Sequence, residues 1–215
     1  MQTPITFFHA PFSRSGVTRA MLEELAEPYD LVALDLERDE QRSAEYLSIN
    51  PMGKVPAIRH QGALITEQPA ILMHLADLHP ERHLAPLIGD PLRGEYLRWM
   101  VFYGSCFEPA ITDRSQNRPP VPQRTSGYGD YDSVMSTLAE QLERGPWLLG
   151  EAFSAADVLW GGALNWALMG RLVPDWPVFR HYSEQVMSRP AIRRAFALDR
   201  ALADDQRQQR EALAA

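Results

Sequence analysis

The sequence predicts two regions of different class, an α/β region over about the first 80 residues and an all-helical region after it. Three observations predict this. Apolar residues alternate between strand-like and helix-like spacing up to residue 78, a proline-rich stretch interrupts the pattern at residues 79–91, and every later apolar stripe has helical spacing. Short strands alternating with helices over such a length suffice for one small layered α/β domain.

The first region predicts the order strand, helix, strand, helix, strand, strand, helix. Gln61 and Gly62 stand between two short apolar runs, which is typical of a hairpin turn. Pro69 is tolerated in the first turn of the last helix, because that amide has no helical partner. The expected elements are a strand at 5–8, a helix from Gly16 to about residue 25, a strand at 30–36, a helix at 41–50, strands at 55–60 and 63–66, and a helix at 67–78.

The second region predicts only helices and connecting loops. Ser154 and Asp157 have the spacing of a capping box, with Ser154 starting a buried helix. Pro109 is expected to bend the first helix near its end, and only the last dozen residues suggest disorder. The first apolar stripe consists of Leu92, Tyr96, Trp99, Met100, Tyr103 and Phe107; a loop follows at 117–130, with further helices at 131–144, after Ser154, at 178–188 and at 191–203. The expected boundaries are residues 1–80, a linker at 81–90, and residues 91–215.

Composition excludes several classes of function. The 21 basic and 28 acidic residues give a net charge of −7, and no basic stripe offsets it, so nucleic acid is not expected as a partner. No run approaches the roughly 18 apolar residues of a membrane span, and the N-terminus lacks the pattern of a secretory signal. Cys106 is the only cysteine, which rules out a disulfide within the chain and favours a reducing compartment. We expect a cytoplasmic protein.

A metal centre is not expected. His74, His79 and His83 are too loosely spaced for zinc-like ligation, which needs four ligands in tight geometry. Cys106 lies near the apolar stripe of the long helix, where a small core residue is the simpler interpretation.

Several short motifs occur in a fixed order along the chain. They are HAPFSRSG at 9–16, NPMGKVPAI at 50–58, the hairpin at Gln61 and Gly62, TEQPAI at 66–71, SAAD at 154–157 and RPAIRRAF at 189–196. Together they resemble the cytosolic glutathione transferase family, in its bacterial, serine-type members, over nearly the whole chain. The resemblance implies a thioredoxin-like first domain, an all-α second domain, glutathione as co-substrate without a metal, and a homodimer.

The resemblance also implies how glutathione is held. Pro56 is cis in the family, which leaves the backbone of Val55 free to pair with a peptide ligand as an added strand. Glu67 and Gln68 stand at the N-terminus of a helix, where amides and the helix dipole favour a carboxylate. Family members usually have Ser or Thr in place of Gln68, so a hydroxyl contact there is absent. Lys54 and Arg14 are candidate helpers for the ligand's charged groups.

Ser15 and Ser13 are the candidates for contacting the sulfur of glutathione. A free thiol has a pKa of about 8.5, and a hydroxyl that donates to a charged partner contributes about 1.5–3 kcal/mol, enough to lower that pKa by roughly one to two units. Ser15 stands four residues before Arg19, a spacing typical of serine-type members, so spacing favours Ser15 and leaves Ser13 as the alternative. Arg14 takes the place of a cysteine found in one bacterial class, which disfavours mixed-disulfide chemistry.

The expected activity is conjugation of the glutathione thiolate to an electrophilic apolar substrate. The electrophile pocket is expected between the domains, with Tyr103, Phe107 and Arg114 as lining residues from the second. Two alternatives remain open. The first is a glutathione-dependent thiol reductase or lyase. The second is a binding protein that kept the fold and lost the catalytic activity.

Overall fold

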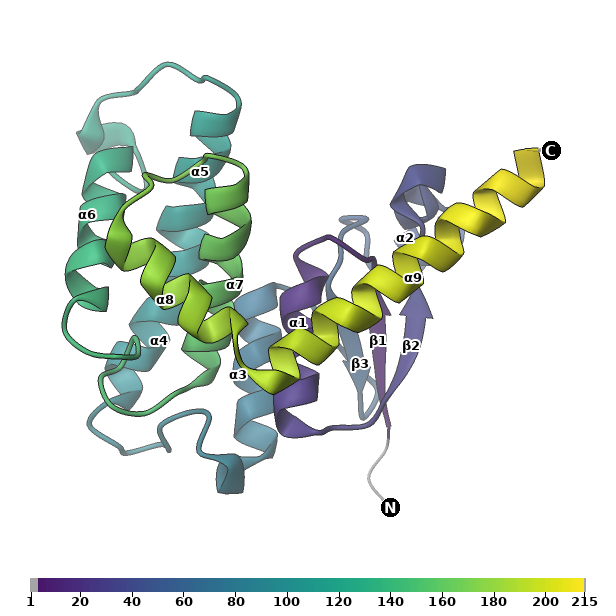
Figure 1. The fold of residues 1–215 in the computed structure, drawn as a ribbon, viewed down its shortest axis with the longest axis horizontal. Coiled ribbons are helices and arrows are strands. Elements are labelled where there is room, and N and C mark those ends of the chain that lie inside the picture. Colours follow the sequence, from purple (N-terminus) through teal and green to yellow (C-terminus); the bar gives the residue numbers. More distant parts are fainter. Residues whose placement is uncertain (1–3, 215) are drawn as a thin grey trace. The chain divides into compact units, whose positions relative to one another are not determined.

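The computed structural model describes residues 4–214, and these form two compact units (Figure 1). The first unit consists of the residues up to Leu75 together with the segment from Pro190 onward, and the second consists of Ala76–Arg189. The sequence assigns the segment after residue 190 to the helical domain, whereas in the structure it groups with the α/β unit. Each unit is described separately.

The first unit contains a four-stranded mixed sheet. The strand order is β2-β1-β3-β4, with β1 and β2 parallel and the other neighbours antiparallel. The helices α1 (Ser15–Leu25), α2 (Ala44–Ile49) and α3 (Gln68–Leu78) alternate with the strands β1 (Ile5–His9), β2 (Tyr29–Ala33), β3 (Ala57–His60) and β4 (Ala63–Ile65). This order confirms the predicted thioredoxin-like βαβαββα arrangement.

The register of the sheet separates its two apolar faces. Phe8 pairs with Ala57, and both pack with Tyr46 of α2, while Phe7 pairs with Ile58 on the opposite face. Side chains alternate along a strand, so each face needs its own helical cover. The Phe7 face faces α1, whose residues Met21, Leu22 and Leu25 are buried. The edge strand β2 is mostly exposed, in contrast to the half-buried strand that its alternation predicts.

The second unit is entirely helical among the described residues 76–189, as predicted. A nearly continuous helical rod begins it, and aromatic side chains of that rod pack around Trp160 of α7. Its helices are α4 (Arg93–Phe102), a π-helical segment η4 (Tyr103–Phe107), α5 (Glu108–Ser115), α6 (Tyr131–Leu142), α7 (Ala155–Met169) and α8 (Pro177–Met187). Pro109 lies in the first turn of α5, directly after the π-helical segment.

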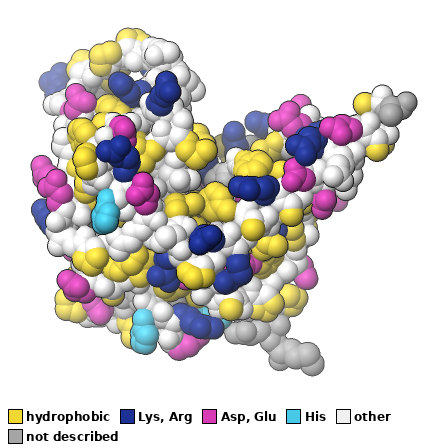
Figure 2. All heavy atoms as spheres, in the orientation of Figure 1, with side chains coloured by type: hydrophobic (Ala, Val, Ile, Leu, Met, Phe, Trp, Pro, Cys, Tyr) yellow, Lys and Arg dark blue, Asp and Glu magenta, His cyan; other side chains and the backbone are white. Residues whose placement is uncertain are grey.

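The last helix is much longer than the sequence predicts. α9 spans Pro190–Ala214, 25 residues, so the expectations of a helix ending near residue 203 and of a disordered end are wrong for the described residues. Figure 1 shows α9 alongside α1. Arg194 contacts Glu23 at 3.3 Å and Arg210 contacts Asp35 at 2.6 Å, so ion pairs hold both halves of the helix to the first unit. Figure 2 shows charged side chains of both signs over the far half of α9, as the polar sequence there requires.

Asp157 holds the start of α7 in place, as its capping-box spacing predicts. Its carboxylate accepts from the Ser154 amide at 2.8 Å, the Leu148 amide at 2.7 Å and the Tyr182 hydroxyl at 2.8 Å. Burial raises the pKa of Asp157, and the hydrogen bonds from Leu148, Tyr182 and Ser154 oppose that rise. One carboxylate thus joins a helix start, a loop and α8.

We predict that Asp157→Ala lowers the stability of the second unit by about 3 kcal/mol, because it removes a cap and leaves buried donors without an acceptor. Urea unfolding followed by tryptophan fluorescence measures this unit alone, since all five tryptophans lie within residues 76–189. The control is Glu151→Ala, which removes an exposed carboxylate and should change stability by less than about 0.5 kcal/mol. Equal midpoints for the two variants would contradict the assigned role.

Candidate functional site

The turn between β1 and α1 carries both candidate serines. β1 ends at His9, and α1 begins at Ser15. Phe12 in this turn has a φ of 56° and is 67% exposed, an uncommon backbone conformation for a large side chain. Such conformations cost about 1–3 kcal/mol and persist where the surroundings impose them, often at functional sites.

Ser15 faces inward from this turn. It has no exposed surface, and its Oγ lies 2.7 Å from His9 Nδ1, 2.6 Å from Ser13 Oγ and 3.0 Å from the Ala10 carbonyl oxygen. The Ala10 amide donates to the same Oγ at 3.1 Å. A hydroxyl has one proton to donate and two lone pairs to accept with, so this environment fully occupies Ser15.

Ser13 is the outer member of the pair. It is half-buried, its Oγ lies 2.8 Å from the Ala10 carbonyl oxygen, and it accepts from the Ser15 amide at 3.1 Å. Spacing favours Ser15 as the residue that contacts a ligand, whereas burial favours Ser13. A ligand in solution can reach only a hydroxyl that has exposed surface.

A charged cluster lies behind the serines. His9 Nε2 is 3.0 Å from Asp199 Oδ1, an ion-pair distance without good hydrogen-bond alignment. Arg19 Nη1 donates to the same oxygen at 2.8 Å, and Arg19 Nε donates to the Tyr29 hydroxyl at 3.2 Å. His9, Arg19 and Asp199 are all at most 4% exposed. The sequence alone does not reveal this cluster, because 190 positions separate His9 from Asp199.

The edge of the sheet next to the turn has the predicted backbone geometry. The Val55-Pro56 peptide bond is cis, which confirms the expectation from the resemblance. β1 and β3 are antiparallel with Phe8 opposite Ala57, so continuing the register by two residues brings Val55 level with Ala10. The Lys54 carbonyl accepts from Tyr46 Oη at 2.7 Å and from Asn50 Nδ2 at 2.8 Å, which fixes the chain just before the proline. The Lys54 side chain itself is exposed.

The start of α3 reaches the same turn. Glu67 is exposed and has a φ of 63°, a second strained position at this end of the sheet. Gln68 is buried, and its Nε2 donates to the Arg14 carbonyl at 2.8 Å. The Gln68 side chain therefore joins α3 to the serine turn, a structural role that its helix-start position alone does not reveal. Arg14 is half-buried at the N-cap of α1.

The three residues predicted to line an electrophile pocket do not share an environment. Phe107 has no exposed surface and Tyr103 is 4% exposed, and both pack against Trp160 in the core of the second unit. The Tyr103 hydroxyl donates to Glu108. Arg114 is exposed and lies over the Tyr131 ring, with 4.7 Å from its guanidinium carbon to the ring centre. Their helical stripe indicates core packing for the two aromatic residues.

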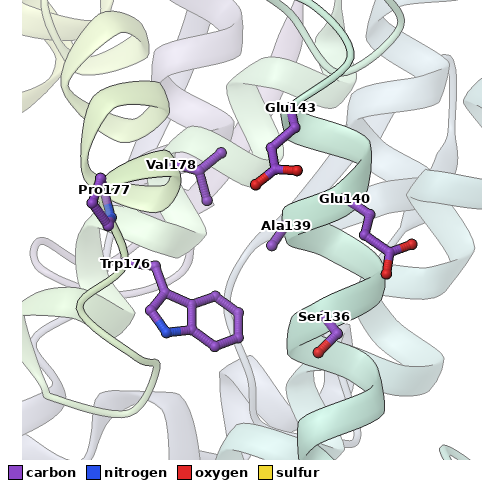
Figure 3. A pocket seen from close by; sticks show the side chains of 7 residues that line it. All are labelled: Ser136, Ala139, Glu140, Glu143, Trp176, Pro177 and Val178. Carbon is purple, nitrogen blue, oxygen red and sulfur yellow. The ribbon is translucent and has the colours of Figure 1, made fainter.

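A separate hollow opens on the second unit, beside α6. It has a volume of about 560 Å³, and Figure 3 shows the Trp176 ring extending across it towards α6. Its lining residues are Ser136, Ala139, Glu140, Glu143, Trp176, Pro177 and Val178, and the predicted site residues lie elsewhere in the chain.

The described residues 4–214 contain neither a metal-binding cluster nor a membrane-spanning helix. No group of three His, Cys, Asp or Glu side chains there is placed to hold a metal ion. No helix in the same range combines the length and apolar character needed to cross a membrane.

The thioredoxin-like sheet carries the serine turn, the cis-proline edge and the start of α3 at one end. Residues 3–77 match the family model of the glutathione S-transferase N-terminal domain, and most of the chain is similar to glutathione S-transferases.

Similar proteins include a transferase and an oxidoreductase. Glutathione S-transferase GstA of Escherichia coli O157:H7 is 24% identical over 89% of this chain and 97% of its own length. Disulfide-bond oxidoreductase YfcG of Escherichia coli K12 is 27% identical over 89% of this chain and 94% of its own. The structure of a sphingomonad glutathione S-transferase complexed with glutathione is 27% identical, covers 90% of this chain and 98% of its own, and has a TM-score of 0.74.

We predict that Gln68→Ala loosens the serine turn without unfolding the protein. Removing the Gln68 amide breaks the 2.8 Å bond to the Arg14 carbonyl, so the amides of residues 10–16 should exchange with deuterium severalfold faster. Hydrogen exchange with mass spectrometry measures this peptide, and the peptide of α6 should not change. Gln61→Ala, in the exposed hairpin turn, is the matched control. Unchanged exchange at residues 10–16 would show that other contacts hold the turn.

Proposed function

We propose that this protein is a glutathione transferase that joins the sulfur of glutathione to an electrophilic carbon of an apolar substrate. The observation that carries the proposal is the outer hydroxyl of Ser13, which has exposed surface and is held at the start of α1 by the Ala10 carbonyl and the Ser15 amide. The Ser13 proton, which the hydroxyl donates to the Ala10 carbonyl here, turns to the thiolate when glutathione binds.

The hydroxyl acts on the pKa of the thiol. A hydrogen bond to a charged group contributes about 1.5–3 kcal/mol, and each pKa unit corresponds to 1.36 kcal/mol. The N-terminus of α1 adds a few tenths to about 1 kcal/mol for a nearby anion. These contributions lower a thiol pKa from about 8.5 to near neutral pH, so the bound sulfur is largely thiolate. Holding the thiolate beside the electrophile supplies further rate by proximity.

The remaining parts of the site position the tripeptide. The backbone of Val55 pairs with the peptide as an added strand, and the amides at the start of α3 take a ligand carboxylate. Glu67 is exposed there and pairs with the ligand ammonium, while Lys54 and Arg14 balance its carboxylates. Gln68 contributes through the turn that it holds. Pro56, which is buried, fixes the backbone direction of Val55.

The proposal also covers the residues that contact the electrophile, the oligomeric state and the cellular location. Of the three expected pocket residues, only Arg114 is exposed. The exposed Phe12 ring, which precedes Ser13 in the turn, is proposed to contact the electrophile. We also propose a homodimer, as the resemblance implies, and a cytoplasmic location, which the single cysteine Cys106 favours.

A second candidate function is thiol reduction, because YfcG, which is similar over most of this chain, is a disulfide-bond oxidoreductase. The turn itself carries Ser13, Arg14 and Ser15 and no cysteine, and Cys106 lies in the second unit. A mixed disulfide between the turn and glutathione is therefore chemically excluded. Conjugation needs no thiol from the protein, so we place it first.

We predict that Ser13→Ala raises the apparent pKa of bound glutathione by about one to two units, because the thiolate loses its charge-assisted hydrogen bond. Ultraviolet absorbance of the thiolate against pH measures this value, after calorimetry has shown that each variant binds glutathione. Ser48→Ala, an exposed serine of α2, is the control and should match the unmodified protein. A second assay follows conjugation of a chlorinated aromatic substrate and reduction of a disulfide in parallel.

The outcomes separate the functions. Bound glutathione whose thiol keeps its solution pKa would overturn conjugation and leave a binding role. A lowered pKa with disulfide reduction and no conjugation would favour the reductase.

A further inference from the structure

Resting on the proposed function, we infer that Ser13, Ser15 and His9 form a proton relay that ends at Asp199 of α9. The relay takes the thiol proton of glutathione inward and stores it on His9 while the thiolate reacts. Ser13 is the residue in contact with sulfur, and Ser15, His9 and Asp199 act through it as positioning residues.

The neighbours of His9 fix which ring nitrogen carries a proton. Nε2 lies 3.0 Å from Asp199 Oδ1 without good hydrogen-bond alignment, and because a carboxylate offers no proton to a ring nitrogen, we place the ring proton on Nε2. Arg19 Nη1 donates to the same oxygen at 2.8 Å. In the neutral ring, Nδ1 is then a proton acceptor, and it lies 2.7 Å from Ser15 Oγ.

The two serines connect Nδ1 to the exposed side of the turn. Ser13 Oγ and Ser15 Oγ are 2.6 Å apart, so each short step from Ser13 to His9 lies within hydrogen-bond distance. The Ala10 amide donates to Ser15 Oγ and the Ser15 amide donates to Ser13 Oγ. These amides occupy one lone pair on each hydroxyl. The Ala10 carbonyl lies 2.8 Å from Ser13 Oγ and 3.0 Å from Ser15 Oγ, so each hydroxyl proton turns from that carbonyl to the chain when glutathione binds.

The transfer balances without a further reactant. The S–H bond of glutathione breaks, the sulfur keeps the electron pair, and the proton goes to Ser13 Oγ. The Ser13 proton moves to Ser15 Oγ, and the Ser15 proton moves to His9 Nδ1. Each hydrogen bond then runs outward, from His9 to Ser15, from Ser15 to Ser13 and from Ser13 to the thiolate. After the thiolate displaces the leaving group as an anion, the proton returns along the chain to solvent.

Charge balance favours this transfer only when the ligand is bound. With His9 neutral, Asp199 and Arg19 form a balanced buried pair. An imidazolium alone would add one uncompensated positive charge to groups at most 4% exposed, which is costly. A thiolate formed at Ser13 supplies the compensating negative charge. The charged and titratable groups facing His9 from the packed elements are Asp199 of α9 and Arg19 of α1, with Tyr29 of β2 on Arg19.

The relay resembles a Ser-His-Asp arrangement whose serine is buried. Ser15 has no exposed surface, so it does not reach a carbonyl substrate as a nucleophile would. Gly16 follows it in α1, and a Cβ there would meet Asp199 Oδ2 at 3.0 Å, so α1 has a residue without a side chain where it packs against this carboxylate.

The experiment counts protons. A thiolate made by simple hydrogen bonding releases one proton to solvent for each thiolate formed, whereas the relay keeps that proton on His9. Thiolate is measured by ultraviolet difference absorbance when glutathione binds near neutral pH, and released protons are measured with an indicator dye in weak buffer. We expect clearly fewer than one proton per thiolate for the unmodified protein.

Variants test each step. Asp199→Asn keeps the size of the side chain and removes the charge that stabilises the imidazolium, and Ser15→Ala breaks the chain while leaving Ser13. Both should form less thiolate at neutral pH and release one proton for each thiolate. His9→Asn retains a hydrogen-bonding group near Ser15 but cannot store the proton. It should therefore also form less thiolate and release one proton for each thiolate. Asp204→Asn is the matched control on α9, because Asp204 pairs with Arg207 of its own helix, and its proton count should equal that of the unmodified protein.

The outcomes distinguish the relay from the proposed function. No thiolate in the unmodified protein overturns the transferase proposal. Thiolate with one proton released for each overturns the relay alone. Because this measurement is made on the unmodified protein, a variant that fails to fold does not remove the test. Variants that fold and keep the low proton count would also overturn the relay.

Discussion

The buried carboxylate of Asp199 is the constraint on which the first unit depends. A carboxylate at 3% exposure needs partners within the protein, and Arg19 of α1 donates to it at 2.8 Å while His9 Nε2 of β1 lies 3.0 Å away. Removing one partner of such a group typically costs about 3–5 kcal/mol. The need to satisfy this charge therefore fixes the position of α9 on α1, and the flanking ion pairs of Arg194 and Arg210 are consistent with that register.

The same constraint reaches the serine turn. His9 is held by Asp199 on one side and by Ser15 on the other, so Ser15 cannot turn outward without leaving a buried ring nitrogen unpaired. Ser13 has no such obligation beyond the Ala10 carbonyl and the Ser15 amide, and part of its surface is exposed. The hydrogen bonds and burial of the folded turn therefore favour Ser13 as the residue that contacts a ligand, whereas the spacing to Arg19 favours Ser15.

Local patterns predicted most of the fold. Three of these patterns depend on residues close in sequence: the change between strand-like and helix-like spacing, the hairpin at Gln61 and the capping box at Ser154. The structure contains the corresponding elements. α9 was predicted too short because its second half has few apolar residues, and ion pairs to distant residues support it. Tyr103 and Phe107 share one apolar stripe, and periodicity does not tell a core stripe from a pocket wall. The contact between His9 and Asp199 joins residues 190 positions apart, and no local pattern in the sequence predicts it.

Keeping the protonated His9 away from the sulfur of glutathione has a chemical advantage in the proposed relay. An imidazolium in direct contact with a thiolate lowers the thiol pKa strongly, but nucleophilicity falls as the pKa falls, and the best attacking thiol has a pKa near the ambient pH. Two hydroxyls between His9 and the sulfur weaken the direct attraction and still give the proton a path. The hydrogen bond from Ser13 then sets a moderate pKa, while the buried ion pair determines where the proton rests. Because α9 places the Asp199 carboxylate behind the serine turn, the pKa of the thiol and the resting place of its proton are set by different residues.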